Sequence, residues 1–188
     1  KHPPGTPKPN AQRNFTDPDS RIMVGKDGFV QAYNAQAAVD ATAQIIVAHG
    51  LTNMAADAPS LITLTDAVID NMGRPPKELS ADAGYCSEAN LAALEAREIP
   101  AYVATGRAKT PAGRVRGGPL TQAMRAKIKR GGYRSRYRLR KQVVEPVFGQ
   151  IKQARGFRQF LLRGLEKVAD EWALVCLAHN ITKMARAG

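Results

Sequence analysis

The charged residues of this 188-residue chain are segregated along its length, and this segregation limits how the chain can fold. From Ile99 to Leu165 the sequence has 17 lysine and arginine residues and one acid, Glu145. The first 98 residues are nearly balanced or mildly acidic. Because unpaired charged side chains are almost never buried, the basic segment must contribute mainly surface. We therefore expect a sheet-bearing core from the first segment and a polyanion-facing surface from the second.

The formal net charge of +12 predicts a polyanionic partner, and DNA or RNA is the leading candidate. Membrane surfaces also attract basic proteins, but no apolar run approaches the roughly 20 residues that span a bilayer. The N-terminus lacks the apolar core of a secretory signal. The two cysteines and three histidines show no metal-ligand spacing, which argues against a zinc site. These features fit a protein of a reducing cytoplasm.

Hydrophobic periodicity predicts an α/β domain over residues 15–188, after a flexible proline-rich lead-in over residues 1–14. The predicted elements of its first part are strands over residues 29–40 and 44–51, a helix over 57–72, a strand over 78–82, a helix over 87–97 and a strand over 101–104. The first two strands are expected to form an antiparallel hairpin. Asp57 is expected to be the N-cap of the first helix rather than a ligand. This order of elements predicts a mixed sheet flanked by helices.

The second half of the chain is predicted to be mainly helical. Residues 105–118 are rich in Gly and Arg and have no periodicity, so we expect a basic loop there. Apolar spacing predicts helices over residues 120–129, 137–154 and 165–186. Pro146 must either kink the second of these helices or lie in its first turn. Trp172 and His179 share the apolar stripe of the last helix, so both are expected in the core.

Asp82 is the first candidate for chemistry. It ends a short predicted strand before a turn at Gly84. Such strand ends are where α/β proteins usually bind ligands. The alternative is that Asp82 merely caps the turn into the next helix, and spacing alone does not separate these two possibilities. Cys86 lies nearby, but nothing flanking it indicates an activated thiolate.

Glu145 is the sharper candidate because it is the one acid among 17 bases. It could form an ion pair with Lys141 at i, i+4, worth a few tenths of a kcal/mol on an exposed helix. That pairing does not explain why a DNA-facing segment would keep a single acid. An anion beside bound phosphates weakens binding unless a cation lies between them, and a divalent metal held by carboxylates and phosphate oxygens removes the repulsion. We therefore favour a metal ligand.

The best candidates for phosphate contacts are basic residues that lie among tyrosines just before Glu145. They are Arg134, Arg136, Arg138, Arg140 and Lys141, with Tyr133 just before them and Tyr137 among them. A tyrosine there could also stack on an unpaired base. Other bases of the segment are expected to form only a solvated surface, because one duplex face cannot touch 17 side chains.

Several motifs together resemble the catalytic domain of DDE-type insertion-sequence transposases of bacteria. Residues 81–85 (Ala-Asp-Ala-Gly-Tyr), followed by Ser87 and Asn90, resemble the family segment with the second catalytic Asp. The residues that resemble its Y-R-E-K signature are Tyr137, Arg140, Glu145 and Lys152. Arg140 precedes Glu145 by one residue more than the commonest spacing. Further similar segments are residues 16–21, 33–36, 144–149, 156–158 and 163–165, so the resemblance runs from about Asn14 to Lys183.

The resemblance implies a ribonuclease H-like fold with a C-terminal helical segment, and cleavage and transfer of DNA strands at insertion-sequence ends. In such families two Asp and one Glu hold two Mg²⁺ ions, for which Mn²⁺ is expected to substitute, and attack on the phosphodiester forms no covalent intermediate. Here it implies that Asp82 and Glu145 are catalytic metal ligands. Together with the basic cluster described above, the signature gives the residues expected to bind DNA: Arg134, Arg136, Tyr137, Arg138, Arg140, Lys141 and Lys152. A homodimer on DNA and a location at the bacterial nucleoid follow only from the resemblance.

This chain departs from the family pattern at the position of the first catalytic Asp. In the family that Asp lies on a first strand that precedes the segment resembled by residues 14–21. We therefore expect this chain to lack that strand and to have an exposed sheet edge; whether the chain is active by itself stays open on the sequence. Asp40 is the other strand-terminal acid considered as a metal ligand, but it aligns better with the second strand, where the family's acid is not catalytic.

Other functions stay open on the sequence. A non-catalytic DNA-binding remnant would keep the basic surface without the triad, and a simple ribonuclease H-like nuclease would cleave DNA without joining it. A basic RNA-binding protein of ribosomal type is the plainest alternative. The sequence does not specify the DNA ends, the target, the oligomeric state or the transposition pathway.

Overall fold

The computed structural model describes residues 13–25, 28–106, 117–131, 137 and 139–187. Its strands are β1 (Arg21–Gly25), β2 (Gly28–Ala32), β3 (Asn34–Val39), β4 (Ile46–Thr52), β5 (Leu79–Ala81) and β6 (Ala101–Val103). Its helices are α1 (Ser60–Met72), α2 (Glu88–Ala96), α3 (Pro119–Gly131), α4 (Leu139–Gly149) and α5 (Leu165–Ala187), with a 3₁₀ turn η1 (Ala83–Tyr85) and a π turn η4 (Gln150–Ala154). The predicted lead-in over residues 1–12 and most of the predicted basic loop, residues 107–116, lie outside this description.

The predicted α/β class is confirmed, but the described strands form three separate pairs instead of one mixed sheet. β1 pairs with β2 and β3 with β4, both antiparallel, whereas β5 and β6 are parallel. The predicted hairpin of the first two strands is confirmed as β3–β4. The prediction of a single strand over residues 29–40 is wrong, because the strand is interrupted at Tyr33. The part before Tyr33 is β2, which pairs with β1. At this interruption the Tyr33 hydroxyl donates to Asp17 Oδ1 at 2.7 Å.

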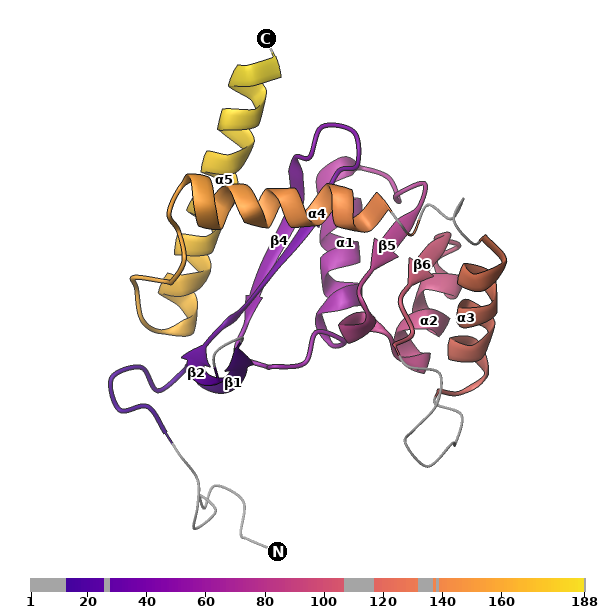
Figure 1. Cartoon of the computed structure of the whole chain (residues 1–188), viewed down its shortest axis with the longest axis horizontal. Helices are drawn as coiled ribbons and strands as arrows, with labels where there is room; N and C mark the ends of the chain where they lie inside the picture. The colour runs from indigo at the N-terminus through magenta and orange to yellow at the C-terminus, as the bar shows by residue number, and fades with distance from the viewer. Residues whose placement is uncertain (1–12, 26–27, 107–116, 132–136, 138, 188) are drawn as a thin grey trace, which may run out of the picture.

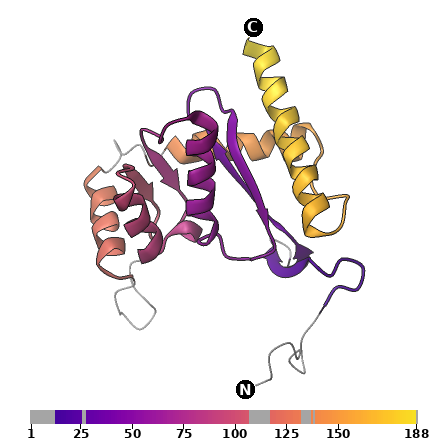
Figure 2. The ribbon, with the colours of Figure 1, turned by 180° about the vertical axis from the view of Figure 1, so that it is seen from behind.

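Helices cover both faces of the β3–β4 hairpin. Figures 1 and 2 show α4 across one face and α1 on the other. One core cluster gathers around β4, α4, η4 and α5, and its buried members are Ile46, Val147, Ile151, Trp172 and Cys176. A second cluster joins α1, α2, β5 and β6, and its buried members are Leu61, Leu91, Leu94, Ile99, Ala101 and Val103. The alternation of β3 explains this layering, since Ala35 and Ala37 pack in the α4 cluster while Asn34 and Gln36 point to the other face.

Helix α5 runs along β4 and ends beyond the body of the molecule (Figure 1). The Asn180 side chain binds the backbone of Ile46 twice, accepting from its N–H and donating to its carbonyl, both at 2.8 Å. The prediction that Trp172 and His179 are core residues is confirmed, since they are 2% and 0% exposed. Trp172 stacks on Phe148 with ring centroids 6.0 Å apart.

Pro146 lies well inside α4 and not in its first turn. Proline has no N–H to donate to the carbonyl four residues earlier, which is that of Gln142. The Gln44 side chain takes this place, because its Nε2 donates to the Gln142 carbonyl at 3.0 Å. The helix predicted over residues 137–154 also differs from expectation at its end, where α4 stops at Gly149 and a π turn follows.

Gln44 is therefore a junction between the β3–β4 turn, α4 and α5. Its backbone is left-handed with φ of 57°, an unusual conformation for a residue other than glycine. Its carbonyl accepts from His179 Nε2 at 2.9 Å, and its Oε1 accepts from Lys183 Nζ at 2.7 Å. Three contacts from two helices thus hold a backbone conformation that is unfavourable by itself.

Replacing Gln44 by alanine is expected to lower the free energy of unfolding by about 1–2 kcal/mol, because the Gln142 carbonyl and the Lys183 ammonium lose their partner. Gln44→Gly loses the same side-chain contacts but relieves the left-handed strain, roughly 1 kcal/mol. The glycine variant should therefore be the more stable of the two in urea titrations. Equal stability of both variants with the parent chain would contradict the role of Gln44.

His179 is buried in its neutral form. An arginine can only donate and a carbonyl can only accept, so Nδ1 accepts from Arg155 Nη1 (3.1 Å) and Nε2–H donates to the Gln44 carbonyl (2.9 Å). Burial lowers the pKa of His179 below its ordinary value of 6.5, and the charges of Arg155 and Lys183 lower this pKa further. The hydrogen bond to Gln44 only partly opposes these effects.

We expect the stability of the chain to fall as the pH drops below about 6.5. In that range the unfolded chain protonates its histidine while the folded chain resists, so acid favours the unfolded state. Urea unfolding between pH 7.5 and 5 measures the effect. In His179→Gln, whose amide can donate and accept but cannot titrate, this part of the pH dependence should vanish. A parent and variant with parallel pH profiles would refute the assignment.

Candidate functional site

Asp82 lies directly after β5, and its side chain is exposed. The pairing of β5 with β6 continues one residue past β6, because Ala104 N–H donates to the Ala81 carbonyl at 3.0 Å. Asp82 occupies the N-cap position of the turn η1, but its side chain makes no capping hydrogen bond. The helix that follows, α2, is capped instead by Ser87, whose Oγ accepts from Asn90 N–H at 3.1 Å. Capping therefore does not account for Asp82.

Asp57 lies against the Asp82 turn, and sequence reasoning missed this. The predicted N-cap role of Asp57 is wrong, because Pro59 holds the N-cap position of α1. The Asp57 Oδ1 accepts instead from Asn34 Nδ2 (2.7 Å) and Gln36 Nε2 (3.1 Å) on β3. A methyl group at Gly84 would lie 2.2 Å from Asp57 Oδ2. The sequence signal is Gly84 itself, which taken alone indicates only a turn.

Tyr85 binds the same Gln36 side chain that binds Asp57. Its hydroxyl donates to Gln36 Oε1. Burial raises the pKa of Tyr85 to about 12, and the negative charge of Asp57 adds to this shift. The phenol is therefore neutral and acts as a hydrogen-bond donor throughout the physiological range.

Glu145 lies in the middle of α4, and its side chain is exposed. The helix is anchored by Val147, which is fully buried, and by Phe148 against Trp172. The alternative ion pair with Lys141 falls outside the described side chains. No salt bridge joins Glu145 to a residue of the described ranges.

The candidate metal ligands do not form a preassembled cluster. Asp82 follows β5, whose residues pack against one core cluster. Glu145 lies on α4, whose residues belong to the other core cluster. Asp40 Oδ2 accepts from Thr42 N–H (2.9 Å) and Ala43 N–H (2.7 Å), so it caps the β3–β4 turn. Among the residues that the structure describes, no group of three or more His, Cys, Asp or Glu side chains could hold a metal ion.

The predicted DNA-binding residues are only partly described. Arg134, Arg136 and Arg138 lie outside the described residues, as do the side chains of Arg140 and Lys141. Tyr137 is half-buried, and burial raises the pKa of its hydroxyl. Lys152 is exposed on η4, with its Nζ 5.9 Å from the centre of the Phe148 ring.

The segment Thr16–Arg21 serves the fold rather than chemistry. Asp17 Oδ1 accepts from Gly164 N–H, and Asp19 Oδ2 accepts from Leu165 N–H, both at 3.1 Å. These carboxylates bind the N-terminus of α5, where free N–H groups favour negative charge. Burial by itself would raise the pKa of Asp17, but hydrogen bonds led by that of Tyr33 bring it below its ordinary value.

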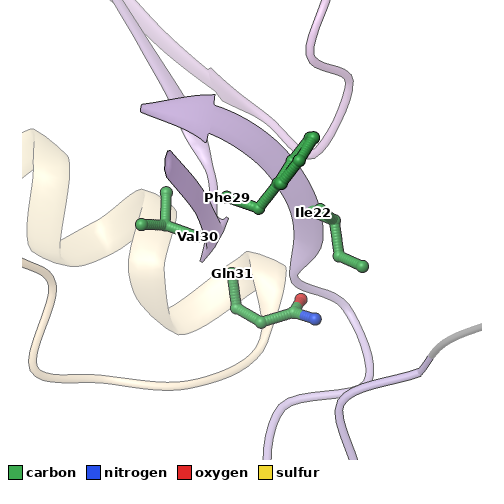
Figure 3. A pocket seen from close by; sticks show the side chains of 4 residues that line it. All are labelled: Ile22, Phe29, Val30 and Gln31. Carbon is green, nitrogen blue, oxygen red and sulfur yellow. The ribbon is translucent and has the colours of Figure 1, made fainter. Parts of the chain in front are cut away.

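A shallow cleft of about 450 Å³ lies on the β1–β2 hairpin. Figure 3 shows its lining residues, Ile22, Phe29, Val30 and Gln31. The lining has no titratable, nucleophilic or metal-binding side chain, so this cleft is not a candidate for chemistry.

Comparison with known proteins gives one match. Residues 112–185 match the family model of the transposase DDE domain. The resemblance to DDE-type transposases is confirmed over this segment, which includes Glu145 and Lys152. No curated protein and no solved structure matches the chain significantly. No helix in the described ranges is long and apolar enough to cross a lipid bilayer.

Proposed function

We propose that this chain, with a transposase DDE domain over residues 112–185, takes part in metal-dependent cleavage and transfer of DNA strands at insertion-sequence ends. The observation that carries the proposal is the place of Glu145, an exposed acid within the matched segment and the one acid among 17 bases. A basic surface binds the DNA backbone, and an acid is useful there only with a cation. The bacterial nucleoid is the proposed location.

Asp82 and Glu145 are the residues that would hold Mg²⁺ or Mn²⁺. Both side chains are exposed carboxylates, and Mg²⁺ prefers one or two carboxylates with water and phosphate oxygens completing its shell. When bound, such ions polarise the phosphodiester and lower the pKa of bound water. The chain's own part is to hold the two carboxylates and the DNA backbone in place, with Tyr137, Arg138, Arg140, Lys141 and Lys152, and with Arg134 and Arg136, as the proposed DNA contacts.

The third carboxylate of the family triad stays unassigned. Of the six described strands, only β5 and β3 are followed directly by an acid. The acid after β3 is Asp40, which is engaged in its turn. The three strand pairs do not join into one sheet. We propose that the described strand pairs belong to a ribonuclease H-like sheet.

A non-catalytic DNA-binding role is the second candidate function. The observation that favours it is the absence of a three-acid cluster among the described residues. Incubation of the chain with supercoiled plasmid DNA and Mn²⁺ separates the two functions. Nicking that EDTA abolishes supports the enzyme, and joined products as well as nicks exclude a simple nuclease. Binding without nicking supports the remnant.

DNA binding is expected to weaken steeply with salt under either function. About five phosphate contacts give a slope of roughly −4.5 in log K against log salt, which is a loss of roughly 500-fold between 50 and 200 mM KCl. Fluorescence anisotropy of a labelled 30-base-pair duplex measures it. The double variant Arg138→Ala with Arg140→Ala should reduce the slope by about 2, whereas Arg74→Ala, outside the basic segment, should not change it. A salt-independent affinity would refute the phosphate interface.

A further inference from the structure

The Asp57 carboxylate is held by two side-chain amides of β3. Besides its bond to Asp57, Gln36 Nε2 donates to Asn34 Oδ1 at 2.7 Å, so both of its hydrogens are used. Its Oε1 accepts from the Tyr85 hydroxyl. Gln36 is only 3% exposed, and every hydrogen-bonding group of its amide has a partner. The amide therefore has one orientation, and it fixes both the carboxylate and the phenol.

The Asp82 turn closes tightly onto this carboxylate. Gly84 does not have a positive φ, so its backbone does not require glycine. Glycine is required instead by the close approach of this backbone to Asp57. A methyl group at Gly84 would lie 2.2 Å from Asp57 Oδ2 and 3.2 Å from Asp57 Cγ. Real Cβ atoms do not come so near to other atoms. Gly84 is thus the residue that lets the turn rest on Asp57.

Asn90 links the segment that contains Asp57 to the Asp82 turn by two further hydrogen bonds. Its Nδ2 donates to the Tyr85 carbonyl (2.8 Å) and to the Ala58 carbonyl (2.7 Å), and the residue is buried. The same amide therefore joins the residue after Asp57 to the residue after Gly84. The tie comes from the first turn of α2, which Ser87 caps.

The turn needs such support because it is too short to hold itself. It has two backbone hydrogen bonds, from Tyr85 N–H to the Asp82 carbonyl (3.1 Å) and from Cys86 N–H to the Ala83 carbonyl (3.2 Å). An isolated 3₁₀ turn of three residues is marginal in water. The path of the backbone through this turn decides where the exposed Asp82 carboxylate lies.

We propose that Asp57 is a positioning residue for Asp82: held by Asn34 and Gln36, its carboxylate supports the turn at Gly84 and so sets the place of the Asp82 side chain. The inference rests on the proposed function, in which Asp82 binds the metal. Asp57 touches neither metal nor DNA in this role.

The test compares Asp57→Ala, Asp57→Asn, Gly84→Ala and the double variant Asp57→Ala with Gly84→Ala in the full chain. The first readout is hydrogen exchange of the Tyr85 and Cys86 amides. We expect Asp57→Ala and Gly84→Ala each to speed this exchange about tenfold or more. The double variant should be no faster than Asp57→Ala alone, because the added methyl group then meets no carboxylate. Asp66→Asn, which breaks the ion pair between Asp66 on α1 and Arg97 at the end of α2, is the control and should leave this exchange unchanged.

The second readout is plasmid nicking as a function of Mn²⁺ concentration. Loss of positioning should raise the half-saturating Mn²⁺ concentration of Asp57→Ala by about 10- to 100-fold, the usual range for a group that orients a metal ligand. The rate at saturating Mn²⁺ should change less. Asp57→Asn keeps the Oδ1 acceptor for Asn34 and Gln36 and should restore most of both properties. An asparagine variant as impaired as the alanine variant would mean that the carboxylate itself is a ligand, and would overturn the positioning role.

The two proposals fail separately. If the parent chain nicks DNA no better than Asp82→Ala, the proposed function fails, while the exchange measurement still decides whether Asp57 holds the turn. If Asp82 is required but Asp57→Ala changes neither the exchange of Tyr85 and Cys86 nor the Mn²⁺ dependence, the positioning role is overturned. Faster exchange with an unchanged Mn²⁺ dependence overturns it as well.

Discussion

Glu145→Gln is expected to abolish metal-dependent DNA cleavage, with a fall in rate on the order of 10²–10³-fold. Glutamine keeps the size of the side chain and its exposed place on α4, but it removes the charge that a divalent ion would bind. DNA binding should be retained or slightly tighter, because the one acid among the surrounding bases is neutralised. Plasmid nicking with Mn²⁺ and duplex anisotropy measure the two properties on the same preparation.

The matched control is Glu166→Gln, a second acid that lies in the first turn of α5 beyond the basic segment. It should leave cleavage unchanged, and Asp82→Asn should reproduce the loss seen with Glu145→Gln. If Glu145→Gln cleaves as fast as the parent, Glu145 is only a surface acid and the metal site is refuted. If binding and cleavage are lost together, the variant has damaged the fold, which the unfolding curve of the same preparation would show.

Trp172→Ala is expected to destabilise the chain by about 3–5 kcal/mol, the usual range for removing a buried tryptophan. The indole is 2% exposed and contacts Phe148 and Phe160. Its Nε1–H also donates to the Gln36 carbonyl at 3.0 Å, which would lose this partner. Because a domain is stable by only about 5–15 kcal/mol, a large share of the variant is expected to be unfolded or partly unfolded at 37 °C.

Trp172→Phe separates packing from the hydrogen bond. It keeps an aromatic ring beside Phe148 and leaves the Gln36 carbonyl unpaired, so the loss should be smaller, about 1–3 kcal/mol. Urea unfolding followed by circular dichroism measures both variants. A loss below about 1 kcal/mol for Trp172→Ala would mean that α5 does not pack on the hairpin as described.

The contact of Trp172 with Gln36 also connects the core to the Asp82 turn. The backbone carbonyl of Gln36 binds α5, while its side chain binds Asp57 and Tyr85. One strand residue thus joins the long C-terminal helix to the turn that carries a proposed metal ligand. Loosening α5 is therefore expected to loosen that turn, a coupling that the exchange of the Tyr85 amide would detect in Trp172→Phe.

Local pattern was sufficient for much of the secondary structure. The apolar spacing of residues 165–186 predicted α5 within one residue, and the buried positions of Trp172 and His179 followed from the same stripe. The β3–β4 hairpin followed from alternation and β-branched residues. These predictions succeed because helix and strand periods are read from neighbouring residues. The break at Tyr33 did not follow from them, because it depends on which strands pair, β2 with β1 and β3 with β4.

The sequence by itself determined the α/β class, the basic segment with its single acid, and the resemblance to DDE transposases, since each depends on composition or on residues close together in the chain. Only the tertiary structure decided that the Asp57 carboxylate binds β3 and lies beside Gly84 instead of capping a helix, and that Gln44 donates to the carbonyl left without a partner by Pro146. The partners in these contacts are 21 and 98 residues apart. A short polar side chain can cap a helix, bind a ligand or support a turn. Its role depends on the residues that the fold brings beside it.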